Sequence, residues 1–143
     1  MNYNLLNTDK QKTFAIILDN GDEVMESLQS FAKEQNLKAS QFSAIGAFRK
    51  TTLGFFDFSI KDYKKTEIDE QVEVLSIAGD ISLYEDKIQV HAHTVPGKSD
   101  GTAYGGHLLK GFVHPTLEII LTESPGYLER KMDKDSHIPL IKI

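Results

Sequence analysis

The sequence contains no cysteine and no tryptophan among its 143 residues. Without cysteine there can be neither a disulfide framework nor a thiolate metal site, so a transition metal would have to bind His, Asp, Glu or water. The first residues lack the charged start and apolar run of a signal peptide. No segment approaches the roughly 18 consecutive apolar residues that span a bilayer. We therefore expect a cytoplasmic protein without membrane contacts.

Acidic residues outnumber basic ones, with 21 Asp and Glu against 16 Lys and Arg, and the formal net charge is −5. Basic residues do not cluster beyond pairs such as Lys64-Lys65 and Arg130-Lys131. This charge balance disfavours a polyanionic partner such as free DNA. The hydrophobic share of 40% suits one packed core, and no Pro/Ser-rich linker divides the chain. We therefore expect a single domain across residues 1–143.

Hydrophobic spacing predicts one helix and a series of strands. Residues 12–18 read as an apolar strand that ends at an Asp-Asn-Gly turn signal, and residues 22–35 place apolar side chains at helical spacing. The acidic pair Asp22 and Glu23 suits the positive end of that helix. Further strands are expected at residues 41–48, 51–58, 67–75, 76–84, 87–95, 106–113 and 116–122, with a short edge strand at 138–143.

One helix set against many consecutive strands indicates an α+β fold. The expected sheet is antiparallel and strongly curved, with about seven strands and one main flanking helix. A helix of about four turns cannot cover a sheet of that width. The sheet must therefore curl toward a barrel or bury a face against a partner, and we predict an oligomer.

The most informative feature is a set of three histidines. Residues 87–95 alternate with period two, so His91 and His93 point to the same face of their strand. Side chains two residues apart on a strand rise by about 6.6 Å, which allows two imidazoles to converge on one ion. A hairpin through the glycine-rich loop at 97–101 would return the chain antiparallel and bring His107 beside them. The three residues are therefore predicted ligands of a divalent metal.

Three neutral nitrogens would leave a tetrahedral ion with one open position, as in catalytic zinc sites. The alternative interpretation is that His91 and His93 are ordinary surface residues of an exposed strand. Two other histidines are interpreted differently from these three. His114 precedes Pro115 at an expected turn, and His137 lies in the polar tail, where we expect it to be exposed.

Two charged residues are secondary candidates for a catalytic role. Glu118 lies within an apolar run and could act as a general base or as an acceptor beside a metal ligand, although its polar same-face neighbours favour an exposed strand face. Arg49 follows a strand at an expected turn, where it could meet an anionic group or simply be solvated. Gly46 and Gly79 within strand patterns indicate bulges or close backbone approach. The aromatics at positions 55, 56 and 58 are expected in the core or at a subunit interface.

Several segments carry a family resemblance. They read GDISL (residues 79–83), HAH (91–93), DGTAYGGHLL (100–109) and GFVHPTLE (111–118), preceded by IGAFRK (45–50). Together they resemble the bacterial and archaeal members of the plants-and-prokaryotes-conserved (PPC) domain family. The resemblance covers a core of about residues 12–125.

The resemblance implies an antiparallel sheet with a flanking helix, a homotrimer, and a metal near His91, His93 and His107 at or near a subunit boundary. Family members are often labelled DNA-binding proteins, because plant relatives join this domain to a basic AT-hook. This sequence departs from them, since it contains no Arg-Gly-Arg-Pro hook and is acidic.

Three functional hypotheses follow. The first is a trimeric metal-binding protein, with zinc as the expected ion, that binds a small molecule or acts on it as a hydrolase or lyase. In that hypothesis the three histidines hold the metal, Glu118 is a candidate base and Arg49 orients an anionic group. The second is a DNA-binding regulator, and the third is a non-catalytic trimeric scaffold.

Overall fold

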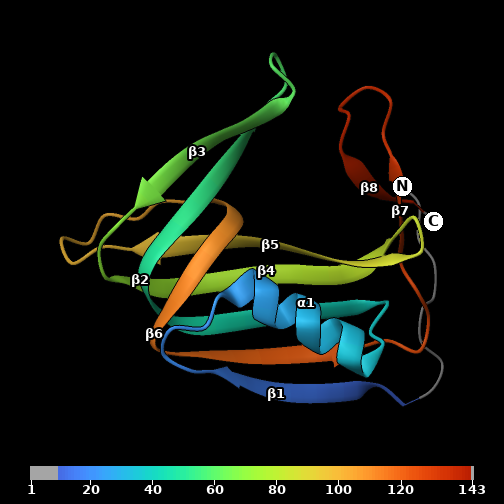
Figure 1. Cartoon of the computed structure of the whole chain (residues 1–143), viewed down its shortest axis with the longest axis horizontal. Helices are drawn as coiled ribbons and strands as arrows, with labels where there is room; N and C mark the ends of the chain where they lie inside the picture. Colours follow the sequence, from blue (N-terminus) through green and yellow to red (C-terminus); the bar gives the residue numbers. More distant parts are fainter. Residues whose placement is uncertain (1–9, 143) are drawn as a thin grey trace.

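A computed structural model describes residues 10–142, and strands dominate it (Figure 1). One helix lies among eight strands in this range, so the expectation of an α+β fold is confirmed in its broad form. The elements in chain order are β1 (Lys12–Leu18), α1 (Val24–Gln35), β2 (Ser40–Asp57), β3 (Asp62–Ile68), β4 (Val72–Tyr84), β5 (Lys87–Gly97), β6 (Gly106–Glu123), β7 (Glu129–Met132) and β8 (Pro139–Lys142).

Helix α1 forms where its sequence predicts it. Val24, Leu28 and Ala32 are buried at four-residue spacing, which places them on one face of the helix against the sheet. The side chain of Glu23 accepts a hydrogen bond from the Glu26 backbone N–H at 2.8 Å and so caps the amino end. Asn36 ends the helix in a left-handed conformation. The helix therefore lies along one face of the curved sheet (Figure 1).

The sheet is mixed and has eight strands in the described range, which corrects the expected purely antiparallel sheet of about seven. The parallel pair is β4 with β7, in which Leu83 and Tyr84 pair with Glu129 and Arg130. The strand β7 was missed because four residues are too few to show a periodicity. The expected edge strand at 138–143 is present as β8 through Lys142, and residue 143 lies outside the described residues.

Two pairs of expected strands each form one continuous strand, because bulges bend the chain where turns are expected, and the expected strand at 67–75 is divided between β3 and β4. Residues 41–48 and 51–58 belong to the single strand β2, and residues 106–113 and 116–122 belong to β6. The pairing of β2 with β6 shifts register between Gly46 and Phe48. A Cβ at Gly46 would lie 2.3 Å from the Thr116 carbonyl oxygen, and one at Gly79 would lie 2.2 Å from the Phe42 ring. The predicted close backbone approach at both glycines is confirmed.

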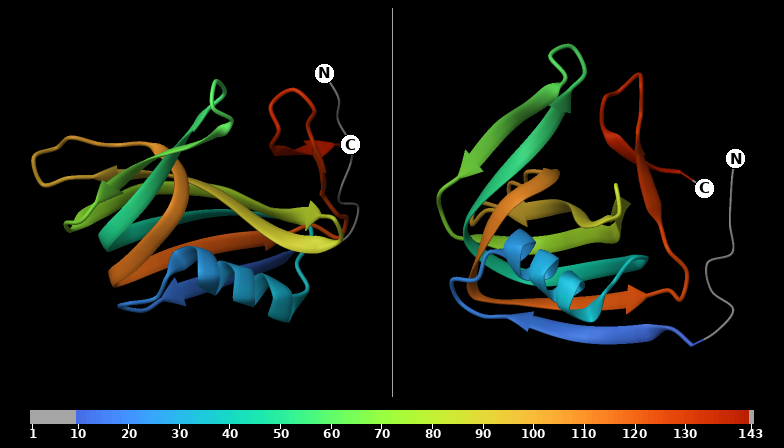
Figure 2. Two further views of the ribbon diagram at one scale, coloured as in Figure 1. Left: turned by 45° about the horizontal axis from the view of Figure 1, so that its top comes forward. Right: turned by 45° about the vertical axis from the view of Figure 1, so that its right-hand side comes forward.

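Four strands close into a ring, which gives the sheet its curvature. Strand β2 pairs with both β4 and β6, β4 pairs with β5, and β5 pairs with β6. The views in Figure 2 show β1 alongside β6 and the β2–β3 hairpin extending away from this ring. The joint between β5 and β6 is short, with only two residue pairs among residues 10–142. It is here that the histidines predicted to bind metal are found.

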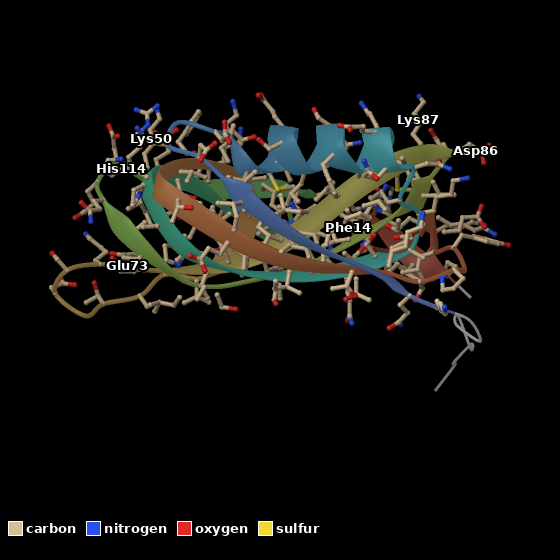
Figure 3. All side chains as sticks on the ribbon, turned by 90° about the horizontal axis from the view of Figure 1, so that it is seen from below. Phe14, Lys50, Glu73, Asp86, Lys87 and His114 are labelled. Carbon is tan, nitrogen blue, oxygen red and sulfur yellow. The ribbon has the colours of Figure 1, made fainter. Side chains whose placement is uncertain are left out.

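The sheet face opposite α1 is apolar and exposed at several positions. Ile45 is 60% exposed, and Ile17, Leu75 and Ile120 are each more than half exposed. Ile17, Ile45 and Ile120 line a shallow groove of about 390 Å³. Figure 3 shows α1 on one side of the curved sheet and side chains projecting from the other. Among the described residues, no helix has the length and apolar character needed to cross a membrane.

Candidate metal centre

The three histidines come together across the short β5–β6 joint. His91 and His93 share one face of β5 because they are two residues apart. His93 is the direct Cα partner of His107 on β6, and opposite residues of an antiparallel pair project to the same side of the sheet. The loop between the two strands turns as a hairpin, with the Lys98 N–H donating to the Thr102 carbonyl at 2.8 Å. This is the arrangement that the sequence predicts.

The side chains converge closely enough to fit one ion. The ring centroids lie 5.1 Å apart for His91 and His93, 5.0 Å for His91 and His107, and 5.3 Å for His93 and His107. One ring nitrogen from each residue lies within 4.8 Å of the other two. Zinc bonds of about 2.0–2.1 Å in a tetrahedron require nitrogens roughly 3.3 Å apart, which small side-chain rotations can supply. The donor set therefore fits a divalent metal.

The surroundings favour neutral imidazoles, which is the form that binds metal. Burial, followed by the neighbouring charges at His91, His93 and Arg130, lowers the pKa of His107 to about 4. Burial, followed by the charge at His91, also lowers the pKa of His93. Near neutral pH, His107 therefore presents a free lone pair.

A carboxylate on the adjacent strand orients the first histidine. Asp80 on β4 is the Cα partner of His91, and its Oδ2 lies 3.3 Å from His91 Nδ1. Burial raises the pKa of Asp80, but hydrogen bonds from His91 and Arg130 and the charge of Arg130 outweigh it and hold that pKa below its ordinary value. Asp80 is therefore an ionised acceptor beside His91, as in the carboxylate–histidine pairs of many metal sites.

The aromatic ring of Tyr63 lies beside the imidazole of His107. The ring of Tyr63 on β3 lies 5.0 Å from that of His107 at an interplanar angle of 36°. Burial raises the pKa of Tyr63, so its phenol is neutral near physiological pH. Tyr63 also contacts Phe56, whose ring contacts Phe58. Phe56 is half-buried, but Phe55 and Phe58 are exposed. The expectation that Phe55 and Phe58 lie in the core of the chain is therefore wrong. Their place at a subunit interface stays a prediction.

Sequence reasoning did not single out Asp80, Tyr63 or Arg130. Asp80 lies in the GDISL segment, and its position directly opposite His91 needs the β4–β5 register. Tyr63 reaches His107 only because β3 pairs with β2. Arg130 comes from a strand that no pattern indicated. Each of these contacts depends on strand pairing, which local periodicity does not specify.

The two secondary candidates lie away from the histidines. Glu118 is exposed on β6, eleven residues beyond His107, and it lines the apolar groove of the outer face. The guanidinium of Arg49 lies 5.2 Å from the centre of the Phe112 ring, and the Lys50 ammonium lies 4.9 Å from it. The structure thus brings neither Glu118 nor Arg49 to the cluster, and their catalytic roles stay predictions.

The remaining histidines are also separate from the cluster. His114 lies within β6, where a turn was expected, and its Nδ1 lies 2.9 Å from Asn20 Oδ1. The bend of β6 at this point replaces the expected turn. His137 is exposed in the connection between β7 and β8, as predicted.

Fold and site together define a mostly β protein of the α+β class with a three-histidine cluster able to hold a metal ion. The chain belongs to the Plants and Prokaryotes Conserved (PCC) domain family, also written PPC, whose sequence profile matches residues 6–125. This finding confirms the resemblance seen in the sequence.

Several solved structures share the fold along nearly the whole chain. A metal-containing protein from Archaeoglobus fulgidus is 32% identical, with a TM-score of 0.89 over 99% of this chain and 100% of that one. A PPC protein from Pyrococcus horikoshii is 29% identical, with a TM-score of 0.87 over 92% of both chains. A candidate DNA-binding protein from Bacteroides thetaiotaomicron is 26% identical, with a TM-score of 0.87 over 91% of both chains.

A curated relative is much longer than this chain. The bifunctional protein GlmU of Synechococcus sp. (strain JA-3-3Ab) is 31% identical in a match that covers 90% of this chain. The chain spans only 22% of the length of that relative.

Proposed function

We propose that this chain is a single-domain metal-binding protein that holds one zinc ion with His91, His93 and His107. The observation that carries the proposal is the convergence of three imidazoles, one of them oriented by Asp80. Zinc suits the site because imidazole nitrogen is a common zinc ligand and the chain has no thiolates. The metal-containing relative from Archaeoglobus fulgidus supports a metal ion in this fold.

The three histidines would hold the zinc ion and would leave a coordination position for a small-molecule ligand. When bound, zinc supplies Lewis-acid polarisation of an oxygen on that ligand. Asp80 fixes the ring of His91, and Tyr63 covers one side of His107 and limits access of water there. Asp80 and Arg130 form an ion pair, so together they add no net charge beside the cation.

The proposed assembly is a homotrimer. Its support in the structure is the exposed apolar face formed by Ile17, Ile45, Leu75 and Ile120, opposite the side that α1 covers. An apolar surface of this kind is normally buried against a partner. The exposed rings of Phe55 and Phe58 on the β2–β3 hairpin offer a second apolar surface for a neighbouring copy.

Metal analysis of the purified protein tests the proposal. Wild-type protein, His93→Ala, His107→Ala and the matched control His114→Ala would be desalted and analysed by inductively coupled plasma mass spectrometry. We expect one zinc per chain in the wild type and the control, and loss of metal from the other two variants. Wild-type protein that takes up no stoichiometric metal after incubation with zinc would end the proposal.

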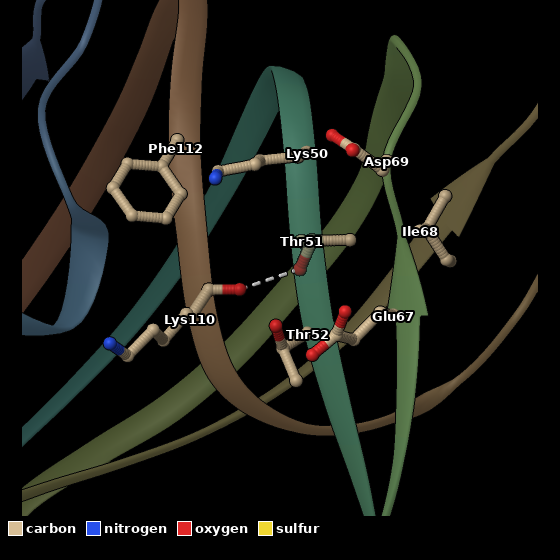
Figure 4. Close-up of a pocket in the computed structure, with 8 residues that line it drawn as sticks. All are labelled: Lys50, Thr51, Thr52, Glu67, Ile68, Asp69, Lys110 and Phe112. Atoms are coloured by element: carbon tan, nitrogen blue, oxygen red, sulfur yellow. Dashed lines mark hydrogen bonds between the residues drawn. The ribbon is translucent and has the colours of Figure 1, made fainter.

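A DNA-binding function is the alternative, and one surface feature favours it. Arg49 and Lys50 lie over Phe112, and Lys50 and Lys110 line a pocket of about 260 Å³ (Figure 4). Glu67 and Asp69 line the same pocket and the net charge is −5, and both features oppose binding to the phosphate backbone of DNA. A salt-sensitive mobility shift of duplex DNA at ~50 mM salt would support this function, and no shift would remove it.

A further inference from the structure

Arg130 on β7 is a buried cation whose nitrogens all have partners. Its side chain is only 7% exposed. Its Nε donates to Ser82 Oγ at 2.7 Å and its Nη1 donates to the Pro139 carbonyl at 3.0 Å. Its Nη2 donates to both carboxylate oxygens of Asp80, at 2.7 and 2.8 Å. Because a guanidinium taken out of water needs such partners, this set fixes the side chain in one orientation.

The same contacts determine which nitrogen of His91 carries its proton. His91 Nδ1 lies 3.3 Å from Asp80 Oδ2 and also 3.3 Å from Arg130 Nη2. Arg130 Nη2 makes its shorter hydrogen bonds to Asp80, and the Asp80 carboxylate can only accept, so we take the carboxylate as the partner of Nδ1. In the tautomer that this contact favours, His91 donates from Nδ1 to Asp80 Oδ2, and its Nε2 keeps a free lone pair.

We infer that Arg130 is a positioning residue for the metal site: it holds Asp80 in the orientation that fixes the Nδ1-protonated tautomer of His91. This inference rests on the proposed metal-binding function and deepens it. Ser82 contributes to the same arrangement, because its hydroxyl accepts from Arg130 Nε and donates to Asp80 Oδ1 at 3.2 Å.

Arg130 lies outside the segment that matches the family profile, because that segment ends at residue 125. Strand β7 pairs in parallel with the end of β4, and β8 pairs with β7 on its other side. Arg130 on β7 thereby reaches Asp80 on β4. The Pro139 carbonyl of β8 accepts a hydrogen bond from Arg130 Nη1. The carboxyl-terminal hairpin, residues 129–142, therefore helps to orient His91, a proposed metal ligand on β5 of the four-stranded ring.

Two simpler roles for Arg130 make different predictions. If Arg130 only attaches the hairpin to the sheet, its loss lowers stability and leaves His91 unchanged. If it acts only through its charge, its loss raises metal affinity, because a cation beside the site repels zinc. A positioning residue that acts through Asp80 instead lowers affinity when removed, and has no further effect once Asp80 is changed.

The test uses full-length Arg130→Met, Asp80→Asn, the double variant, and Lys131→Met as a matched control on the same strand, where Lys131 is exposed. Long-range ¹H–¹⁵N spectra of the metal-free proteins report the tautomer of His91. Competition with a chromophoric chelator reports zinc affinity, and circular dichroism reports folding.

We expect His91 to be Nδ1-protonated in the wild type and in Lys131→Met, and to shift toward the Nε2-protonated form in Arg130→Met and Asp80→Asn. Zinc affinity should fall by about 10–100-fold in each single variant, with no further fall in the double variant. An unchanged tautomer, unchanged affinity or higher affinity in folded Arg130→Met overturns the inference.

If Arg130→Met does not fold, Asp80→Asn decides by the same two measurements. An unchanged tautomer in that variant overturns the role of the carboxylate through which Arg130 acts. Failure of the wild type to bind zinc is a different result, because it contradicts the proposed metal-binding function. The tautomer measurement would still test the contact between His91 Nδ1 and Asp80 Oδ2.

Discussion

His93 and His107 face each other as Cα partners where β5 meets β6. Among residues 10–142 this joint contains only that pair and Thr94 with Gly106, whereas the other three joints of the ring are long ladders. The two imidazoles therefore lie on the shortest joint of the four-stranded ring. A metal held by both residues cross-links the joint, which couples metal binding to local stability.

Zinc should accordingly stabilise the folded protein. At free zinc 100 times its dissociation constant, binding to the native state alone contributes about 2.7 kcal/mol. We expect a higher Tm by calorimetry, and slower amide hydrogen exchange at Thr94 and at Gly106. The His107→Ala variant should show neither effect, while His114→Ala should behave as wild type. Equal stabilisation of His107→Ala by zinc would show that the metal binds elsewhere.

The metal-free protein should lose stability as the pH falls through the range in which His107 titrates. Its folded pKa of about 4 lies below the ordinary value of 6.5, so the unfolded chain takes up the proton first. The stabilising contribution is complete above about pH 6.5 and is lost progressively down to about pH 4. Urea unfolding at about pH 7 and about pH 4.5 should therefore show a larger loss for wild type than for His107→Gln. An identical loss in both would contradict the burial of a neutral His107.

The sequence predicts the histidine cluster because each step depends on local rules. Period-two alternation places His91 and His93 on one face, and a glycine-rich loop between two apolar segments indicates a hairpin that returns His107. The helix was predictable for the same reason, since apolar residues at helical spacing and an acidic start are contained within its own segment. Short-range patterns therefore account for the proposed metal ligands and for α1.

The contacts around those ligands depend on long-range pairing, which local patterns do not encode. Arg49 and the His114-Pro115 pair are expected at turns from the sequence, although in the fold they lie within strands that bend and continue. Arg130 reaches Asp80 only because β7 adds in parallel to the edge of β4. The residue that orients a ligand could thus not be identified until the order of strands in the sheet was known.

Replacing Gly46 by alanine should destabilise the fold. The added methyl group would lie 2.3 Å from the Thr116 carbonyl oxygen, and a backbone atom cannot move aside as a flexible side chain can. We expect a loss of about 1–3 kcal/mol in the free energy of unfolding, measured by urea denaturation. Gly105→Ala is the matched control, because its nearest neighbour would lie 3.9 Å away. Equal stability of the two variants would show that β2 and β6 separate easily at the bulge.

The proposed trimer should dissociate when charge is added to the apolar outer face. Ile45 is 60% exposed, so Ile45→Lys should leave each chain folded but remove apolar contact between copies. Light scattering coupled to size exclusion should show the molar mass fall from about three times 16.1 kDa to that of one chain. Ser30→Lys adds the same charge on the exposed side of α1 and should leave the trimer intact. A wild-type protein that already elutes as a monomer would contradict the assembly.

The carboxylate of Glu23 performs two structural tasks at once, and its removal should show both. Its Oε2 accepts the Glu26 N–H at the start of α1, and its Oε1 accepts the N–H of buried Gly111 on β6 at 2.9 Å. Glu23→Ala leaves the helix uncapped and a buried donor unpaired, so we expect a loss of about 1–3 kcal/mol in urea unfolding. Glu34→Ala removes an exposed acidic residue from the same helix and should change stability by less than about 0.5 kcal/mol. A loss in Glu23→Ala no larger than in this control would mean that water replaces both hydrogen bonds, and that α1 is held to the sheet by its apolar face alone.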